Sequence, residues 1–257
     1  MPLPAAAARY PLSPILCREE MQLMNSPDST VELISSSTCP FAQRSRMVLL
    51  TKGVDFKLTE ISLDHKPDWF LKISPYAKVP VLRHRDGVLY ESAVINEYIE
   101  DVFPDPPLLP QDPSRRALAR VWIAFANDRM VPHVYKMMLR QDAAGQQAHR
   151  ERLQEAVLQM EFEGLRKLSS GPFWFGESPN LVDFTFFPHV QRFAVLKHYR
   201  GFTLPEECAR LRTWTAAMHA LPAVQATKPS DETLIRNWSK YAFNTSAGTT
   251  ARDMRDI

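Results

Sequence analysis

The sequence predicts a small α/β unit followed by a longer all-helical unit, and three observations support this prediction. Short runs with the alternating pattern of β-strands occur before residue 104, five prolines crowd residues 103–113, and the apolar pattern after them is helical. So dense a proline run cannot continue a helix or join the interior of a sheet. We therefore expect an α/β domain at 29–104, a linker at 105–113 and a helical domain at 114–243.

Composition limits the function classes. The chain has 257 residues, of which 45% are hydrophobic, so it can bury a substantial core. Its 31 basic and 29 acidic residues give a net charge of +2, too small for a broad field that would hold nucleic acid. Three cysteines are too few for a disulfide framework and indicate a reducing, cytoplasmic compartment. No run approaches the roughly 20 apolar residues that span a bilayer, so we expect no membrane partner.

The two ends of the chain have the composition of unfolded segments. Residues 1–28 contain an alanine run that prolines interrupt and that no basic residue precedes, unlike a signal peptide. We expect a disordered N-terminal extension there. Residues 244–257 are small and polar, and a flexible tail is predicted.

The α/β unit begins with a strand, helix, strand pattern. Apolar residues alternate in VELIS from Val31 and in FKLTEIS from Phe56, and the spacing between them is helical. Pro40 suits the first helical position, where its missing N–H does no harm, and Gly53 follows as a stop.

A hairpin and a second helix complete this unit. VPVLRH from Val79 and VLYE from Val88 read as antiparallel strands that turn at Asp86 and Gly87. A helix then begins near Ser92, whose hydroxyl is predicted to cap it.

The second unit reads as helices with apolar faces. Asn180 is a predicted N-cap, with Asp183 as its capping-box partner, and further helices are expected near 206–220 and 231–243. Pro132 predicts a kink in the first long helix. The two apolar stripes consist of Val121, Trp122, Phe125, Met130, Val134 and Met138, and of Leu153, Val157, Met160, Leu165 and Leu168.

Cys39 stands at the first strand-to-helix corner, immediately before Pro40. The unpaired N–H groups at a helix N-terminus favour a thiolate, so we expect a lowered pKa and a reactive sulfur. The alternative is a buried cysteine that serves as a small hydrophobe. Position 42 is alanine, so no second thiol lies within reach along the helix, and a reactive Cys39 would follow a monothiol cycle.

The run STCPFAQRSRMVLLTKGVDFKLTEISLDHKPDWFLKISPYAKVPVL, residues 37–82, resembles the omega class of the glutathione transferase family and related bacterial proteins with an active-site cysteine. The resemblance is close to about Pro110 and looser from there to about Phe243. It implies a thioredoxin-like N-terminal domain followed by a C-terminal helical bundle. It also implies glutathione as co-substrate and a homodimer.

The resemblance assigns the glutathione site. Pro80 matches the cis-proline of the thioredoxin-like fold, whose preceding residue, here Val79, pairs with the ligand backbone. Glu91 and Ser92 match the pair that binds the γ-glutamyl end, at a helix N-terminus. Taken alone, Pro80 could be an edge-strand proline and Ser92 a simple N-cap.

Four further residues are candidates for the same pocket. Lys66 matches the lysine that pairs with the glycyl carboxylate, and Phe41 matches a residue lining the pocket. By default Lys66 would be a solvated surface charge and Phe41 a core residue. Tyr135 and Trp238 are candidate walls of the acceptor site, although aromatic residues on helices are more often core or interface.

Other polar residues have simpler explanations. The seven histidines show no i, i+4 pair that would place two metal ligands on one helical face, so no metal is expected. No glycine-rich phosphate loop is present.

The resemblance and these residues predict a cytoplasmic glutathione-dependent thioltransferase or reductase, dehydroascorbate-reductase-like and able to remove glutathione from an oxidised acceptor, with Cys39 as nucleophile. The first alternative is a conjugating transferase or a lyase of the β-etherase type, in which the glutathione thiolate attacks a small electrophile. The second is a non-catalytic binding module with the transferase fold.

Overall fold

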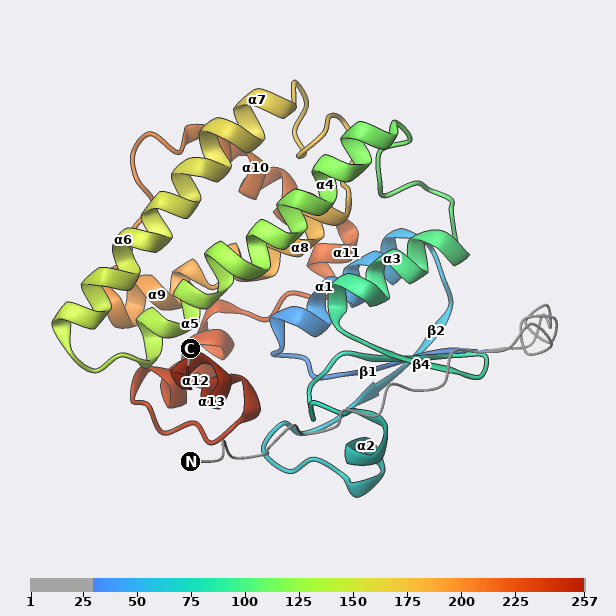
Figure 1. Ribbon diagram of the computed structural model, residues 1–257, viewed down its shortest axis with the longest axis horizontal. Coiled ribbons are helices and arrows are strands. Elements are labelled where there is room, and N and C mark those ends of the chain that lie inside the picture. The colour runs from blue at the N-terminus through green and yellow to red at the C-terminus, as the bar shows by residue number, and fades with distance from the viewer. Residues whose placement is uncertain (1–29, 257) are drawn as a thin grey trace, which may run out of the picture.

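The computed structural model describes residues 30–256 (Figure 1). The predicted N-terminal extension at 1–28, with Cys17, lies outside the described residues. The first unit contains a four-stranded sheet in the order β2-β1-β3-β4, in which β1 and β2 are parallel and the other pairs antiparallel. Its elements are β1 (Val31–Ser35), α1 (Pro40–Thr51), β2 (Phe56–Glu60), α2 (Asp68–Ile73), β3 (Val81–His84), β4 (Gly87–Tyr90) and α3 (Ser92–Val102).

Helix α1 has the predicted start and stop. Pro40 is its first residue, Lys52 is its C-cap and Gly53 follows with a φ of +64°, a conformation that glycine adopts without strain. In Figure 1, α1 lies between the sheet and the helices of the second unit, and it packs on both α3 and α8. The corner before α1 therefore faces both units.

Two local predictions are wrong by one residue. The hairpin turn consists of Arg85 and Asp86, with the positive φ at Arg85, because His84 pairs with Gly87 and Gly87 belongs to the strand. The N-cap of α3 is Glu91, and Ser92 is the first helical residue. The hydroxyl of Ser92 therefore does not cap the helix.

The second unit is helical throughout its described length. Helix α4 continues through a π-helical segment, η2, into α5, and Pro132 lies in the first turn of α5, where a kink was expected. Its elements are α4 (Pro113–Phe125), η2 (Ala126–Met130), α5 (Val131–Leu139), α6 (Ala143–Gln159), η3 (Met160–Leu165), α7 (Arg166–Leu168), α8 (Leu181–Gln191), α9 (Phe193–Arg200), α10 (Ala209–Ala220), α11 (Pro222–Gln225), α12 (Asp231–Ala242) and α13 (Thr249–Asp256).

One apolar cluster joins the two units. It contains Leu33 and Met47 of the first unit together with Trp122 and Phe186 of the second.

The prediction that Val121 belongs to the core stripe is wrong. Val121 is 61% exposed, because the buried face of α4 runs through Ala119, Trp122 and Ile123 instead.

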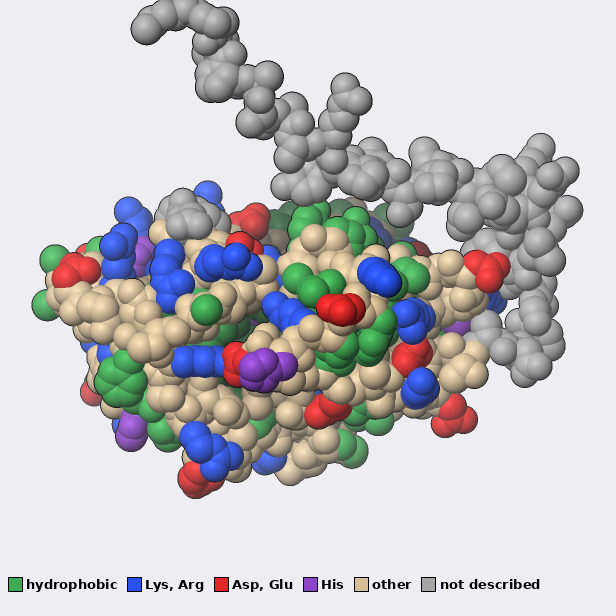
Figure 2. Space-filling model, turned by 90° about the horizontal axis from the view of Figure 1, so that it is seen from below, with side chains coloured by type: hydrophobic (Ala, Val, Ile, Leu, Met, Phe, Trp, Pro, Cys, Tyr) green, Lys and Arg blue, Asp and Glu red, His purple; other side chains and the backbone are tan. Residues whose placement is uncertain are grey.

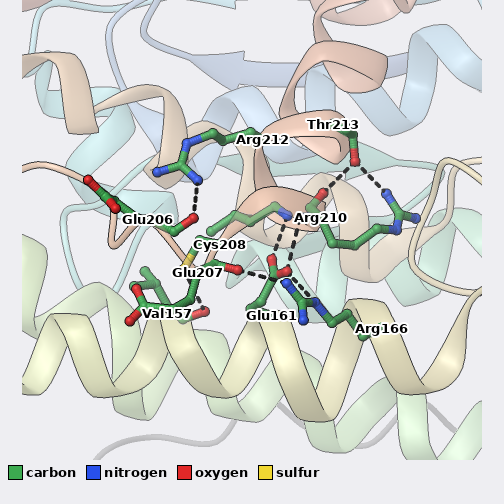
Figure 3. A network of polar contacts seen from close by, with 10 residues as sticks. Val157, Glu161, Arg166, Glu206, Glu207, Cys208, Arg210, Arg212 and Thr213 are labelled. Atoms are coloured by element: carbon green, nitrogen blue, oxygen red, sulfur yellow. Dashed lines mark hydrogen bonds and ion pairs between the residues drawn. The ribbon is translucent and has the colours of Figure 1, made fainter.

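Buried carboxylates fix helix ends in the second unit. Asp183 forms the predicted capping box with Asn180 and also accepts hydrogen bonds from Trp174 N and Trp214 Nε1. Glu161, fully buried in η3, accepts from the backbone N–H groups of Arg210 and Leu211 at the start of α10 (Figure 3). These contacts satisfy donors that a helix start leaves without intrahelical partners.

The C-terminal residues differ from the prediction of a flexible tail, because residues 249–256 form helix α13. Ala251 is buried, Met254 packs against the core cluster, and α13 lies against α5. Figure 1 shows α13 beside α12 at the end of the molecule that carries α2. Packing against α5 thus overrides the weak intrinsic preference of this polar segment. Within residues 30–256, no helix is long and apolar enough to cross a membrane.

Candidate active site

A cavity of about 400 Å³ lies between the two units, and all nine residues singled out from the sequence line it. They come from the start of α1 and the corner before it, the segment between β2 and α2, the segment before β3, the start of α3, and helices α5 and α12. The residues are Cys39, Phe41, Lys66, Val79, Pro80, Glu91, Ser92, Tyr135 and Trp238.

Cys39 is the N-cap of α1 and is 9% exposed. Its thiol donates to the carbonyl oxygen of Val79 across 3.7 Å. Burial raises the pKa of Cys39, and the backbone N–H groups of Phe41 and Ala42, with the charges of Arg192 and Arg46, oppose that rise without reversing it. The predicted lowering of this pKa is therefore wrong, because desolvation outweighs the effect of the helix end.

Arginine side chains hold the loop that carries the thiol. Arg192 donates from Nη2 to the carbonyl oxygen of Thr38 across 3.0 Å, and from Nη1 to Gln43 Oε1 across 2.8 Å. Arg46 donates from Nη2 to the carbonyl oxygen of Ser37 across 3.1 Å. Burial lowers the pKa of Arg192 to about 10, so it stays cationic at neutral pH. Neither arginine was predicted, because the only signal in the sequence was its position in or beside an apolar helical stretch.

A further buried arginine, Arg44, supports the start of α3. It donates from Nη1 to Ser92 Oγ across 3.3 Å and to Asn127 Oδ1 across 2.8 Å, and from Nε to the carbonyl oxygen of Thr185 across 2.9 Å. Its guanidinium lies 4.9 Å from the centre of the Phe41 ring. Arg44 therefore orients two of the predicted ligand-binding residues from behind.

The segment before β3 has the predicted geometry. The Val79–Pro80 peptide bond is cis, and β3 lies inside the sheet, so Pro80 is not an edge-strand proline. Glu91, across the cavity, has a φ of 68°, which is strained for a residue with a side chain. Its position places a carboxylate beside the N-terminus of α3.

Lys66 has a partner that the sequence did not reveal. Its Nζ donates to Thr249 Oγ1 of α13 across 3.0 Å, and burial lowers its pKa. Nearby, Lys78 forms an ion pair with Asp253, also of α13. Figure 2 views the molecule from the side of α2 and α13, where Lys and Arg side chains lie among carboxylates. Helix α13 thus covers the end of the cavity that contains Lys66.

The wall opposite Cys39 is aromatic. Tyr135 stacks on Trp238 with ring centres 5.0 Å apart, and Tyr241 meets Tyr135 edge-on at 5.6 Å. Phe41 lies parallel to Tyr135 at 6.5 Å. Tyr241 was not predicted; it lies three residues after Trp238 on the same face of α12, and this spacing could have found it.

Outside the cavity, His133 of α5 and His149 of α6 bring their Nδ1 atoms to 3.1 Å. The search for histidines at i, i+4 spacing missed this pair because the two residues lie on different helices. Burial lowers the pKa of His133 to about 4, and the charges of Lys136 and Arg152 act in the same direction.

In the part of the chain that the structure describes, no group of three or more His, Cys, Asp or Glu residues could hold a metal ion.

Cys208 is the second described cysteine, and it lies in another part of the molecule (Figure 3). Its sulfur lies 4.0 Å from the carbonyl oxygen of Val157, and it is fully buried. Burial raises its pKa to about 11. Cys208 is therefore a poor candidate for the reactive thiol.

Comparison with known proteins identifies both units. The family model for the N-terminal domain of glutathione S-transferases matches residues 38–102, and the model for the C-terminal domain matches residues 144–217. The chain is 31% identical over 201 residues to glutathione S-transferase omega-1 of Sus scrofa, covering 78% of this chain and 81% of the relative.

Two solved structures illustrate the likeness of the fold. Glutathione transferase Omega 3C of Trametes versicolor superposes with a TM-score of 0.73 at 26% identity, covering 87% of this chain and 94% of the other. The dehydroascorbate reductase of Chlamydomonas reinhardtii superposes with a TM-score of 0.67 at 25% identity, covering 82% and 98%.

Proposed function

Because this chain belongs to the glutathione S-transferase family, we propose that it is a glutathione-dependent thioltransferase or reductase with Cys39 as nucleophile. It is an omega-like glutathione transferase, an enzyme with a thioredoxin-like domain and a helical domain that uses glutathione. The proposal concerns the reaction. The observation that carries it is the Cys39 thiol in the wall of the cavity, at the start of α1, between the two units.

The proposed function gives glutathione one orientation in the cavity. In this proposal the backbone of Val79, before Pro80, pairs with the cysteinyl residue of glutathione, while Glu91 and Ser92 hold the γ-glutamyl end. The latter lie at the N-terminus of α3, which favours an anion. Lys66 takes the glycyl carboxylate, and Phe41 lines the pocket. These assignments place the ligand sulfur beside Cys39.

The reaction then needs two thiol–disulfide exchanges. The Cys39 thiolate attacks the glutathione sulfur of an acceptor mixed disulfide, the acceptor leaves as a thiolate, and Cys39 is left joined to glutathione. A second glutathione thiolate attacks that disulfide, which releases oxidised glutathione and restores the Cys39 thiolate. Two electrons pass from glutathione to the acceptor, and no other reductant is required. An oxidised acceptor such as dehydroascorbate, suggested by the algal reductase, would draw the same two electrons.

The raised pKa of Cys39 does not remove it as a nucleophile. Thiolate nucleophilicity increases with thiol pKa, so a smaller ionised fraction is partly offset by a more reactive anion. The backbone N–H groups of Phe41 and Ala42 and the charges of Arg192 and Arg46 favour the anion once the proton leaves. We expect the reaction rate to rise with pH through the alkaline range.

Mass spectrometry tests the proposal. Incubated with oxidised glutathione, the protein should gain one glutathione, removable by a reducing agent, on the peptide that contains Cys39. The Cys39→Ser variant should gain none and should lose reductase turnover. Labelling of Cys17 or Cys208 in place of Cys39 would refute the mechanism.

One observation favours a second reaction. Burial raises the pKa of the Cys39 thiol, which already donates to a carbonyl oxygen, so it could equally donate to the thiolate of bound glutathione. Glutathione would then attack an electrophile itself, by conjugation or by lysis of an aryl ether. This alternative would be favoured if the Cys39→Ser variant still conjugates glutathione and if neither the variant nor the unchanged protein shows reductase turnover. The non-catalytic alternative is not retained, because the family assignment is to an enzyme.

The quaternary structure and the compartment belong to the same proposal. We propose a cytoplasmic homodimer, the compartment being inferred from the three scattered cysteines. The acceptor is a small electrophilic or oxidised molecule that enters beside the aromatic wall.

A further inference from the structure

Tyr135 carries a hydroxyl in the wall of the cavity. It is 3% exposed, it lines the cavity together with Cys39, and its hydroxyl makes no hydrogen bond to any residue between 30 and 256. A buried phenol normally finds a partner for its O–H. Tyr199, for comparison, donates to the carbonyl oxygen of Ile235 across 3.0 Å. A hydroxyl without a protein partner, in the wall of a ligand cavity, is available to a ligand.

The ring of Tyr135 is fixed on all sides. Trp238 stacks on it at 5.0 Å with an interplanar angle of 28°, and Phe41 lies parallel to it at 6.5 Å with an angle of 10°. Tyr241 closes one side edge-on. These contacts come from α1 and α12, so both units determine where the hydroxyl lies. A donor fixed in advance stabilises charge without reorganisation during the reaction.

The surroundings keep this hydroxyl protonated. Burial raises the pKa of Tyr135 well above its ordinary value, and a negative charge on Tyr241 or Cys39 acts in the same direction. The positive charges of Arg192 and Arg44 oppose that rise without reversing it. At neutral pH the side chain is therefore a donor, and it lies in the same electrostatic neighbourhood as the sulfur of Cys39.

We propose that the Tyr135 hydroxyl is a catalytic hydrogen-bond donor to the group that leaves when Cys39 takes glutathione from the acceptor. The inference rests on the proposed thiol exchange and adds the group that stabilises its departing anion. As the Cys39 sulfur bonds to the glutathione sulfur, the old sulfur–sulfur bond breaks and its electron pair stays on the acceptor sulfur. Tyr135 donates a hydrogen bond to that sulfur and keeps its own proton. The rings of Trp238 and Phe41 beside it favour acceptors with an aromatic group.

The test compares Tyr135→Phe with the unchanged protein, since phenylalanine keeps the stacked ring and removes only the hydroxyl. The substrates are mixed disulfides of glutathione with a series of substituted aryl thiols that differ in acidity. A hydrogen bond to an anion contributes roughly 1.5–3 kcal/mol, so kcat/KM should fall about 10- to 100-fold, with KM nearly unchanged. The loss should be largest for the least acidic thiol, whose anion needs the donor most.

Two controls separate this inference from the function on which it rests. Tyr199→Phe removes a phenol hydroxyl outside the cavity and should keep the kinetics of the unchanged protein. Cys39→Ser reports on the nucleophile: if it loses turnover while Tyr135→Phe keeps the full rate for every thiol, the role of Tyr135 is refuted and the function stands. An equal loss across the series would also refute it, because a positioning or structural role would not depend on thiol acidity. Full turnover in Cys39→Ser would refute the function itself.

Discussion

The sulfur of Cys39 is surrounded by groups that act on its pKa in opposite directions. Burial disfavours the thiolate, and the carbonyl oxygen of Val79 accepts from the thiol and so favours the protonated form. Arg192, Arg46 and the first N–H groups of α1 favour the anion. Of these, Arg192 is completely buried and also holds the carbonyl of Thr38, the residue before Cys39. It therefore acts on both the charge and the position of the sulfur.

Replacing Arg192 with glutamine should raise the pKa of Cys39 further. An opposite charge near a thiolate lowers the pKa of the thiol, and this variant removes that charge. Alkylation of Cys39 by iodoacetamide at pH 8 should slow several-fold, and the rate-against-pH curve should move to higher pH. Arg236→Gln, at an exposed site on α12, serves as the control and should leave the curve in place. An unchanged curve in Arg192→Gln would show that its charge does not reach the sulfur.

The sequence was sufficient to find the residues of the cavity but not their partners. Cys39, Phe41, Glu91 and the others line one cavity because motif position determines where a side chain lies in a known fold. The direction of the Cys39 pKa shift depends on burial among residues such as Phe70 and Val81, which are distant in the sequence. Buried arginines are equally hard to predict, since residue type alone indicates a solvated charge.

At the scale of elements, α13 competes for the positive charges that the ligand would use. Thr249 accepts from Lys66, and Asp253 pairs with Lys78, at the end of the cavity assigned to the glycyl carboxylate. The contacts lie partly in solvent, and exposed ion pairs contribute little. These two polar contacts are thus weak enough to be displaced by a ligand carboxylate.

Replacing Asp253 with asparagine should therefore strengthen glutathione binding. An exposed pair is worth up to about 1 kcal/mol, which corresponds to a gain of at most about fivefold in affinity. Isothermal titration calorimetry at low salt would measure it, and the gain should shrink as salt screens the charges. Asp231→Asn, at the start of α12, is the control. Weaker binding in Asp253→Asn would mean that α13 supplies a ligand contact instead of competing with one.

Helix α8 depends on one carboxylate for its start. Asp183 accepts from Asn180 N, Trp174 N and Trp214 Nε1, and Asp183→Ala leaves these three buried donors without a partner. Each such donor costs about 1–3 kcal/mol, so the free energy of unfolding should fall by at least about 3 kcal/mol. Urea denaturation would measure the loss. Asp142→Ala removes a solvent-exposed cap of α6 and should cause a smaller loss. Equal losses would show that burial of the donors does not matter.

Elements were predictable where local sequence determines them. The positions of prolines and glycines and the spacing of apolar residues predicted α1 and the strands, and a short polar motif predicted the capping box of Asn180 and Asp183. All of these are present. Helix α13 could not be predicted, because residues 249–256 are polar and become helical only against α5 and the cavity.

At the scale of the whole molecule, the cavity exists because the two units share one core. Arg44 of α1 donates to Ser92 of α3, Asn127 of η2 and Thr185 of α8, so a single side chain ties the sheet unit to two parts of the helical unit. Every residue assigned to glutathione belongs to this one chain. The proposed contacts to glutathione thus need no second chain, and we expect assembly to use another surface.

Helices α3 and α4 offer that surface. Val94 is 55% exposed and Val121 is 61% exposed, and between these helices Arg120 pairs with Glu97. The helical period placed Val121 in a core stripe, but no part of the described chain covers it. A homodimer interface would explain why an apolar residue that follows the core pattern is covered by no described part of its own chain.

The Val121→Glu variant should consequently dissociate the proposed homodimer, because two carboxylates related by a twofold axis would meet in an apolar contact and could not be desolvated. Size-exclusion chromatography with light scattering should give twice the chain mass of 29.4 kDa for the unchanged protein and the chain mass for the variant. Leu71→Glu places the same charge on an exposed apolar residue of α2 and should leave the dimer intact. Because the cavity is built from one chain, the monomeric variant should still take up one glutathione on Cys39. A dimer that survives Val121→Glu would place the interface elsewhere.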